Sequence, residues 1–295
     1  MTTLADLGIN ANLAGRVEQR TRCPQCSQRE RDDALGVNIE TGAFHCFRCG
    51  FKGRAGGHYP APRPLMRIDD PAVAQRKRER LRSTWRESVV LTHSKAHAVR
   101  QYLCARGLEE ILREPPKALR AHPGLEYWDG TRSLGIFPAM IALFAGAAGD
   151  PVTLHATYLR ADGCIKAQVP SPRKILGVPV RGATKGGAIH LHEPRYRVLG
   201  IAEGIESALS LHLLCKFPVW ASFCADNLER VRLPENLREL HIGIDIDESG
   251  KGEKVAKGLA ERVRRWQRRT RVVLWRPEIE GPGDLNDEVL RRRAM

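Results

Sequence analysis

The sequence contains no apolar run long enough to span a bilayer, which argues against an integral membrane protein. Its first ten residues include Asp6 and lack a basic segment followed by an apolar stretch, so a secretory signal is not expected. Acidic side chains are also scarce, with 34 Asp and Glu against 48 Lys and Arg. These features predict a globular cytoplasmic protein with no membrane partner and an excess of positive charge.

The formal net charge of +14 favours a polyanionic partner, because basic side chains release counterions when they bind a phosphate backbone. Part of the excess is clustered, in residues 76–86, 262–271 and 291–293. Clustering favours nucleic acid over a basic surface that serves only solubility.

The length of 295 residues is enough for two or three compact units. A run of glycines and prolines after Gly56 predicts a linker between the first unit and the rest. We expect a small cysteine-containing domain at 1–57, a linker at 58–70, a helical basic segment at 71–134, a mixed α/β basic subdomain at 135–196 and an α/β domain at 197–295.

The last segment alternates strand and helix patterns. Strands are predicted at 198–202, 219–223, 240–245 and 272–275, with helices at 205–214 and after Gly252. Val255, Leu259, Val263 and Trp266 recur at helical spacing in the second helix. This alternation predicts a parallel sheet covered by helices, so the fold class is α/β multidomain.

Four of the eight cysteines form two CxxC pairs, Cys23 with Cys26 and Cys46 with Cys49, and nineteen residues separate the pairs. Two such pairs present four thiolates to one tetrahedral ion, which indicates one structural zinc. A redox-active dithiol is the competing interpretation, but it would need only one pair. The other four cysteines are isolated and receive no chemical role.

The predicted ribbon carries basic and aromatic side chains near its cysteines. Arg48 and Lys52 are candidate partners for phosphate groups. Phe44, Phe47 and Phe51 would either stack on bases or fill the small core, and at least one of them is expected in the core.

Acidic residues follow three of the predicted strands, where open α/β sheets bind ligands. These residues are Glu203, then Asp245 with Asp247, then Asp284 with Asp287. If the strand extends through Asp245 and Asp247, their carboxylates point the same way and can hold one divalent cation.

The residues Ala202-Glu203-Gly204 and Asp245-Ile246-Asp247 resemble the Toprim signature. The segment 42–50, which holds the second CxxC pair, resembles the zinc ribbon of bacterial, phage and plasmid primases. Both occur in the order found in primases, so the sequence resembles a DNA primase with an N-terminal zinc ribbon and a C-terminal Toprim domain, which has a Rossmann-like parallel sheet.

The resemblance implies roles for individual residues. Glu203 would aid proton transfer, and Asp245 and Asp247 would hold magnesium or manganese, with Asp284 and Asp287 as a second acidic group. The middle of the chain more loosely resembles the basic subdomain that precedes Toprim, with Lys174, Arg181 and Lys185 as candidate contacts for nucleotide or template phosphate.

One position departs from the family pattern. Many bacterial primases have an aspartate four positions after the glutamate, where this chain has Ser207 preceded by Glu206. Glu206 either substitutes for that aspartate or faces solvent.

The resemblance implies primer synthesis for DNA replication: nucleoside triphosphates are joined on a single-stranded DNA template, and any replicative helicase is a separate partner. Two alternatives remain. A Toprim nuclease or topoisomerase-like enzyme would use the same acids to cut DNA, although no motif identifies a catalytic tyrosine. A recombination mediator would bind DNA without catalysis.

Overall fold

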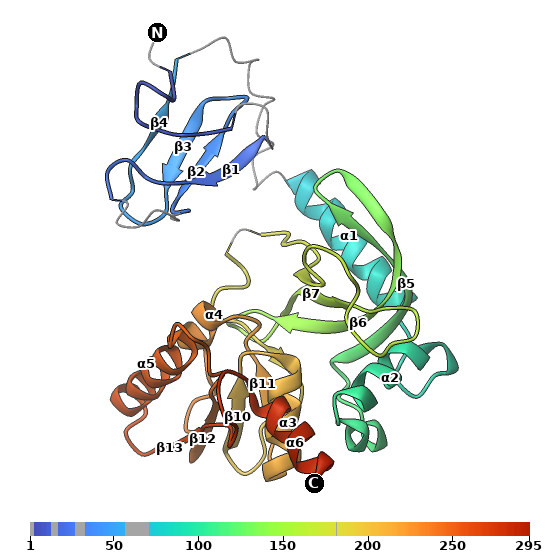
Figure 1. The fold of residues 1–295 in the computed structure, drawn as a ribbon. Coiled ribbons are helices and arrows are strands. Elements are labelled where there is room, and N and C mark those ends of the chain that lie inside the picture. The colour runs from blue at the N-terminus through green and yellow to red at the C-terminus, as the bar shows by residue number, and fades with distance from the viewer. Residues whose placement is uncertain (1–2, 13–16, 27–32, 57–70, 181) are drawn as a thin grey trace. The chain divides into compact units, whose positions relative to one another are not determined.

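The computed structural model describes residues 3–12, 17–26, 33–56, 71–180 and 182–295. The predicted linker at 58–70 and Arg181 lie outside these residues. The chain divides into two compact units, Met1–Arg67 and Ile68–Met295 (Figure 1). Within the described ranges, no helix has both the length and the apolar character needed to cross a membrane.

The first unit is built on a four-stranded antiparallel sheet in the order β1-β2-β3-β4. Its strands are β1 (Glu18–Thr21), β2 (Leu35–Asn38), β3 (Ala43–Cys46) and β4 (Lys52–Arg54). β2 and β3 pair as an antiparallel hairpin. The core is small, with Leu35, Val37 and Phe44 buried beside two of the cysteines.

The second unit begins with helices and an antiparallel sheet in the order β5-β6-β7-β8. The helices are α1 (Pro71–Glu87) and α2 (His97–Ala105), with the short 3-10 turns η1 (Ser94–Ala96) and η2 (Glu109–Arg113). The strands are β5 (Leu119–Asp129), β6 (Arg132–Ala145), β7 (Pro151–Tyr158) and β8 (Arg173–Ile175).

The antiparallel sheet begins earlier in the chain than the sequence indicates, because β5 lies within the segment predicted to be helical. Pro123 and Gly124 interrupt this strand and resemble a turn in the sequence. A register shift between His122 and Leu125 accommodates them while pairing with β6 continues on both sides.

The C-terminal part contains the predicted parallel sheet, in the order β13-β12-β10-β11-β9. Its strands are β9 (Ile189–His190), β10 (Val198–Ala202), β11 (Val219–Ala221), β12 (Glu239–Gly243) and β13 (Arg271–Trp275). β10 to β13 are parallel, and β9 pairs antiparallel with β11 at the edge.

Helices cover both faces of this sheet (Figure 1). They are α3 (Ile205–Cys215), α4 (Ala225–Arg230), α5 (Lys251–Trp266) and α6 (Leu285–Ala294). Leu199, Ile201 and Ile242 pack with α5, whereas α3 and Leu285 of α6 share a second core with α2, β5 and β6. The shared core joins the antiparallel sheet to the parallel one within the second unit.

Candidate metal and acidic sites

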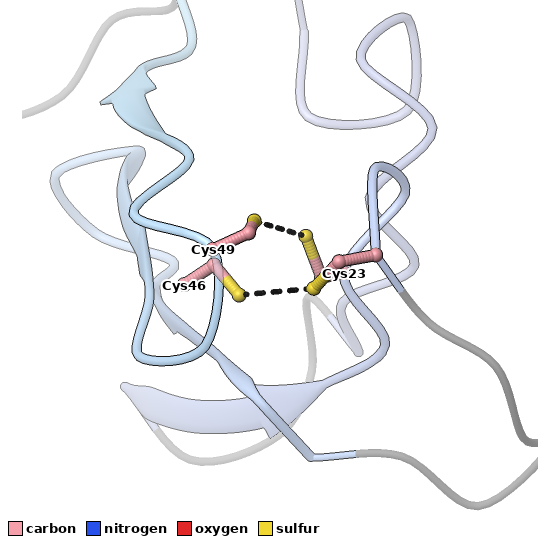
Figure 2. A group of neighbouring side chains, drawn as sticks. Cys23, Cys46 and Cys49 are labelled. Carbon is pink, nitrogen blue, oxygen red and sulfur yellow. Dashed lines mark hydrogen bonds between the residues drawn. The ribbon is translucent and has the colours of Figure 1, made fainter.

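Four cysteine sulfurs converge in the first unit (Figure 2). Cys23 and Cys26 follow β1, Cys46 ends β3, and Cys49 lies in the turn before β4. All four Sγ atoms lie within 4.8 Å of one another. The Sγ atoms of Cys23 and Cys49 are 3.7 Å apart, and those of Cys26 and Cys46 are 3.6 Å apart.

These separations fit a tetrahedral metal site. A disulfide would bring two sulfurs to about 2.05 Å. Four thiolates at about 2.3 Å from one zinc ion would lie about 3.8 Å apart, close to the distances found here. Burial opposes ionisation of Cys46, but backbone N–H groups of Cys49 and Arg48 outweigh it and lower the pKa of the thiol to about 6. The cluster therefore has the geometry and donor set of a structural zinc site.

The three phenylalanines of the ribbon differ in how deeply they are buried. Phe44 is buried and packs against half-buried Phe51, with ring centroids 4.9 Å apart. Phe47 is 64% exposed, and the Arg20 guanidinium lies 4.1 Å from its ring centroid. The expectation that an aromatic residue belongs to the core is confirmed for Phe44. Arg48 and Lys52 are exposed on the same unit.

The second candidate site is the group of acidic residues in the Toprim-like segment, and Asp245 is its central carboxylate. It follows β12, and its Oδ1 atom is buried without a hydrogen-bond partner. Burial, together with the negative charges of Asp284 and Glu203, raises its pKa to about 7. A divalent cation would satisfy the buried oxygen and offset the repulsion.

Asp247 is placed differently from the sequence prediction. β12 ends at Gly243, so no regular strand carries Asp245 and Asp247. Asp247 is exposed and accepts hydrogen bonds from the backbone N–H groups of Lys251, at 3.2 Å, and Gly252, at 2.9 Å. Hydrogen bonds from Ser249 and from these N–H groups lower its pKa to about 2. This carboxylate therefore anchors the start of α5.

Asp284 and Asp287 are brought beside this loop by an antiparallel bridge between Ile246 and Gly283. The two acids form a capping box at the start of α6: Asp284 accepts from the N–H of Asp287, and Asp287 accepts from the N–H of Asp284. Asp284 also accepts a hydrogen bond from the Ser207 hydroxyl at 3.0 Å. The capping box accounts for the hydrogen bonds of Asp284 and Asp287. The negative charge of Asp284 also acts on Asp245.

Glu203 follows β10 and faces the same end of the sheet. Burial raises its pKa, while the positive charges of Arg173 and Lys251 oppose that rise. In the part of the chain that the structure describes, the four cysteines are the one group of three or more His, Cys, Asp or Glu side chains gathered closely enough to hold a metal ion. The acids are therefore not a preassembled set of three ligands, and a magnesium ion at this end of the sheet would be held by one or two carboxylates plus water and substrate phosphates.

Two models of known protein families match parts of this chain. Residues 198–294 match the family model described as Toprim domain. This segment is a Toprim domain. Residues 75–186 match a model described as a domain of unknown function (DUF7146). A comparison with curated proteins found no match.

Solved primases are among the similar structures. The primase fragment of the bacteriophage T7 primase-helicase protein is 14% identical, with 94% of this chain and 99% of that chain covered and a TM-score of 0.40. The Aquifex aeolicus primase is 15% identical, with 94% and 78% covered and a TM-score of 0.39. The RNA polymerase domain of Mycobacterium tuberculosis primase DnaG is 14% identical, with 76% and 80% covered and a TM-score of 0.41.

Sequence reasoning missed Arg173, a cation whose charge acts on both Glu203 and Asp245. Its Nη1 atom lies 3.9 Å from the point that a Cβ atom would occupy if residue 204 were not glycine. Lys174, which was predicted instead, lies over the Tyr127 ring and donates to the Trp128 carbonyl oxygen at 2.7 Å. Neighbouring residues on a strand face opposite sides, so no sequence signal distinguished this adjacent pair.

Glu206 does not face solvent. It is 4% exposed, accepts a hydrogen bond from the Tyr102 hydroxyl at 2.5 Å and pairs with Lys166 at 3.2 Å. Burial opposes its ionisation, but Lys166 and Tyr102 outweigh that effect and lower its pKa to about 2. Glu206 therefore links the Toprim domain to α2 and to the segment between β7 and β8, a contact that no local pattern could reveal.

Two further basic residues of the middle segment, Lys185 and Arg181, were predicted to contact phosphate. Lys185 lines a separate cleft. Arg181 lies outside the described residues, so its contact with nucleotide or template phosphate stays a prediction.

Proposed function

We propose that this chain is a DNA primase that joins nucleoside triphosphates on a single-stranded DNA template. The observation that carries the proposal is the buried, unpartnered Oδ1 atom of Asp245 at the carboxyl ends of the Toprim strands. A four-cysteine ribbon in the same chain supports a function in DNA handling.

Residues around Asp245 suit nucleotidyl transfer. Arg173 supplies a positive charge for the triphosphate, and Asp245, together with Glu203 or Asp247, would hold magnesium or manganese. The metal would neutralise phosphate charge and favour departure of pyrophosphate. Asp284 and Asp287 would serve as a second acidic group, because their oxygens already form the capping box of α6, whereas Asp245 has a buried oxygen without a hydrogen-bond partner.

Glu203 is suited to move the proton. Its pKa is raised by burial, which makes its carboxylate a better base than an exposed glutamate. When a hydroxyl oxygen bonds to the α-phosphorus, the bond to pyrophosphate breaks and Glu203 accepts the hydroxyl proton.

The first unit would hold zinc through Cys23, Cys26, Cys46 and Cys49 and would engage template. Arg48, Lys52 and the exposed ring of Phe47 supply phosphate and base contacts there. A replicative helicase as a separate partner stays a prediction.

Primer synthesis is the decisive test. Full-length protein, single-stranded templates of mixed sequence, nucleoside triphosphates and magnesium or manganese should give short oligonucleotides, resolved on denaturing gels. Asp245→Asn and Glu203→Gln should each reduce synthesis at least ~100-fold, the size of a typical loss of one acid or base catalyst. Asp129→Asn makes the same kind of change on an exposed carboxylate of β5 and should have no effect.

Other outcomes would overturn the proposal. Cleavage of DNA without primer synthesis, abolished by Asp245→Asn, would assign the Toprim site to a nuclease. Binding of DNA with neither reaction, and wild-type behaviour of both acidic variants, would assign the chain to recombination mediators.

A further inference from the structure

A cleft of about 1010 Å³ lies at the end of the parallel sheet opposite the acids, lined mainly by the Toprim domain and also by Ala147, Lys185 and Gly186 of the preceding segment. Its lining includes Arg197, Leu237 and Thr270, which come directly before or within two residues of β10, β12 and β13. Glu203 and Asp245 follow the other ends of the first two of these strands. A five-residue strand is about 16 Å long, so the cleft is separate from the acidic site.

The cleft has an unusual concentration of positive charge. Seven basic residues line it, against one acidic residue, Glu235. The basic residues are Lys185, Arg197, Arg230, Arg232, Arg262, Arg268 and Arg269. Throughout the described residues, none of the seven forms a salt bridge with an acidic side chain. Cations that outnumber the acidic side chains of a concave surface attract a polyanion.

Trp266 adds an aromatic surface at the edge of the cleft. Helical spacing places it in line with Val255, Leu259 and Val263, which are all buried, yet its own side chain is 80% exposed. Trp266 is the last residue of α5, beyond the part of the helix that packs on the sheet. An exposed indole contributes nothing to the core but offers a flat surface on which a base can stack.

Arg262 is already positioned in the cleft before any ligand binds. Its Nη2 atom donates to the Val231 carbonyl oxygen at 2.5 Å, and its Nε atom is buried without a partner. A guanidinium held in this way loses little conformational entropy when it meets a phosphate.

We propose that this cleft binds single-stranded nucleic acid, with its arginines on the phosphates and Trp266 stacked on a base. Arginines that line an open groove beside an aromatic ring match the way proteins bind single strands without reading their sequence. An acidic protein segment would use the arginines but would leave the exposed indole without a partner. The proposal goes beyond nucleotide transfer and does not depend on it.

Photo-crosslinking on the full-length protein tests the location of this site. An octathymidylate that carries one 5-iodouridine should crosslink to Trp266, as mapped by mass spectrometry of the digested protein. The Asp245→Asn variant should crosslink to the same extent as wild type. The crosslink therefore reports on binding at the cleft independently of primer synthesis. If none of the peptides that line the cleft is crosslinked, the proposal is overturned.

Affinity measurements by fluorescence anisotropy test the two kinds of contact. Trp266→Ala should weaken binding of the octathymidylate about five- to tenfold, and Trp266→Phe should retain most of the affinity because the ring can still stack. Arg268→Ala with Arg269→Ala should lower the slope of log affinity against log salt by about two.

Arg264→Ala with Arg265→Ala is the matched control. These arginines are exposed near the end of α5, a few positions before Arg268 and Arg269, but do not line the cleft, so crosslinking and salt slope should stay near wild type. An equal loss in both double variants would overturn the proposal, because charge alone would then explain binding. Tighter binding of hexaglutamate than of octathymidylate, unaffected by Trp266→Ala, would also overturn it and would assign the cleft to an acidic protein partner.

Discussion

Asp245 and Glu206 are two acids of the Toprim domain with opposite environments. The Asp245 carboxylate has a buried oxygen without a partner and faces other acids, so its pKa is raised to about 7. Glu206 is more deeply buried but is paired with Lys166 and Tyr102, and its pKa is lowered to about 2. Charge partners, and not burial alone, therefore decide which acid is stable when ionised.

Asp245→Asn should stabilise the protein when no divalent cation is present. Because the folded-state pKa of Asp245 is raised, ionisation costs stability as pH rises from about 3.8 to 7. The substitution removes this cost, so the free energy of unfolding should rise by about 1–3 kcal/mol at pH 8 and by less at pH 5. Thermal unfolding at both pH values measures the difference. Magnesium should stabilise wild type and leave the variant nearly unchanged; an equal magnesium effect on both would contradict a role of Asp245 in metal binding.

Glu206→Gln should destabilise the protein by about 2–3 kcal/mol at pH 7, because it removes the charge partner of Lys166 and a charged acceptor for Tyr102. The folded-state pKa lies below the ordinary value of 4.5, so this contribution is present above pH 4.5 and is lost as pH falls toward 2. Chemical denaturation at pH 7 and pH 4 measures the change. Glu110→Gln alters the exposed pair with Lys216 and should leave the free energy of unfolding nearly unchanged.

At the scale of elements, the start of α5 fixes the loop that carries the acids. Gly250 precedes the helix with a positive φ of 67°, and Asp247 accepts hydrogen bonds from the first N–H groups of the helix. A Cβ atom at Gly252 would lie 2.1 Å from the Asp245 carbonyl oxygen. The helix can approach Asp245 this closely only because residue 252 is glycine.

Gly252→Ala should therefore cost about 1–3 kcal/mol of stability and reduce activity more strongly than its effect on stability alone would predict, because the backbone of Asp245 must move. Gly258→Ala, in the same helix, is the matched control. Its Cβ atom would lie 3.0 Å from the flexible carboxylate of exposed Glu229, and alanine gains helix propensity, so the change should be neutral or stabilising by up to ~1 kcal/mol. Circular dichroism melts and primer synthesis measure both variants. Equal behaviour of the two would refute the steric argument.

At the scale of the whole molecule, the two units depend on different sources of stability. The first has a small apolar core beside its cysteines, whereas the second has extensive cores on both faces of its parallel sheet. A domain as small as the first commonly needs metal for a stable fold.

Elemental analysis should find one zinc per chain, and removal of zinc by a chelator should unfold the first unit while the second keeps its melting temperature. Structural zinc contributes on the order of 10 kcal/mol in such domains, more than a small core supplies. Hydrogen exchange with and without chelator resolves the two units. Cys46→Ser should act like the chelator, and Cys104→Ser, at an exposed cysteine outside the cluster, should have no effect. Zinc-free protein with a protected first unit would contradict this view.

Local patterns in the sequence were enough to predict many of the elements. The two CxxC pairs specified the four-cysteine cluster because each pair places two sulfurs on one turn. Alternation of apolar residues predicted β10 at residues 198–202, and helical spacing predicted α5. The residues after β10 and β12 were recognisable as Toprim acids because the motif is short and contiguous.

Tertiary structure alone decided how those acids are used. β12 ends before Asp245, Asp247 caps α5, and Arg173 rather than Lys174 faces the acids. The burial of Glu206 by Tyr102 and the exposure of Trp266 likewise depend on packing between distant segments. Sequence periodicity reports only on neighbours a few positions apart, whereas these features depend on where a strand stops and which remote side chain lies next to it.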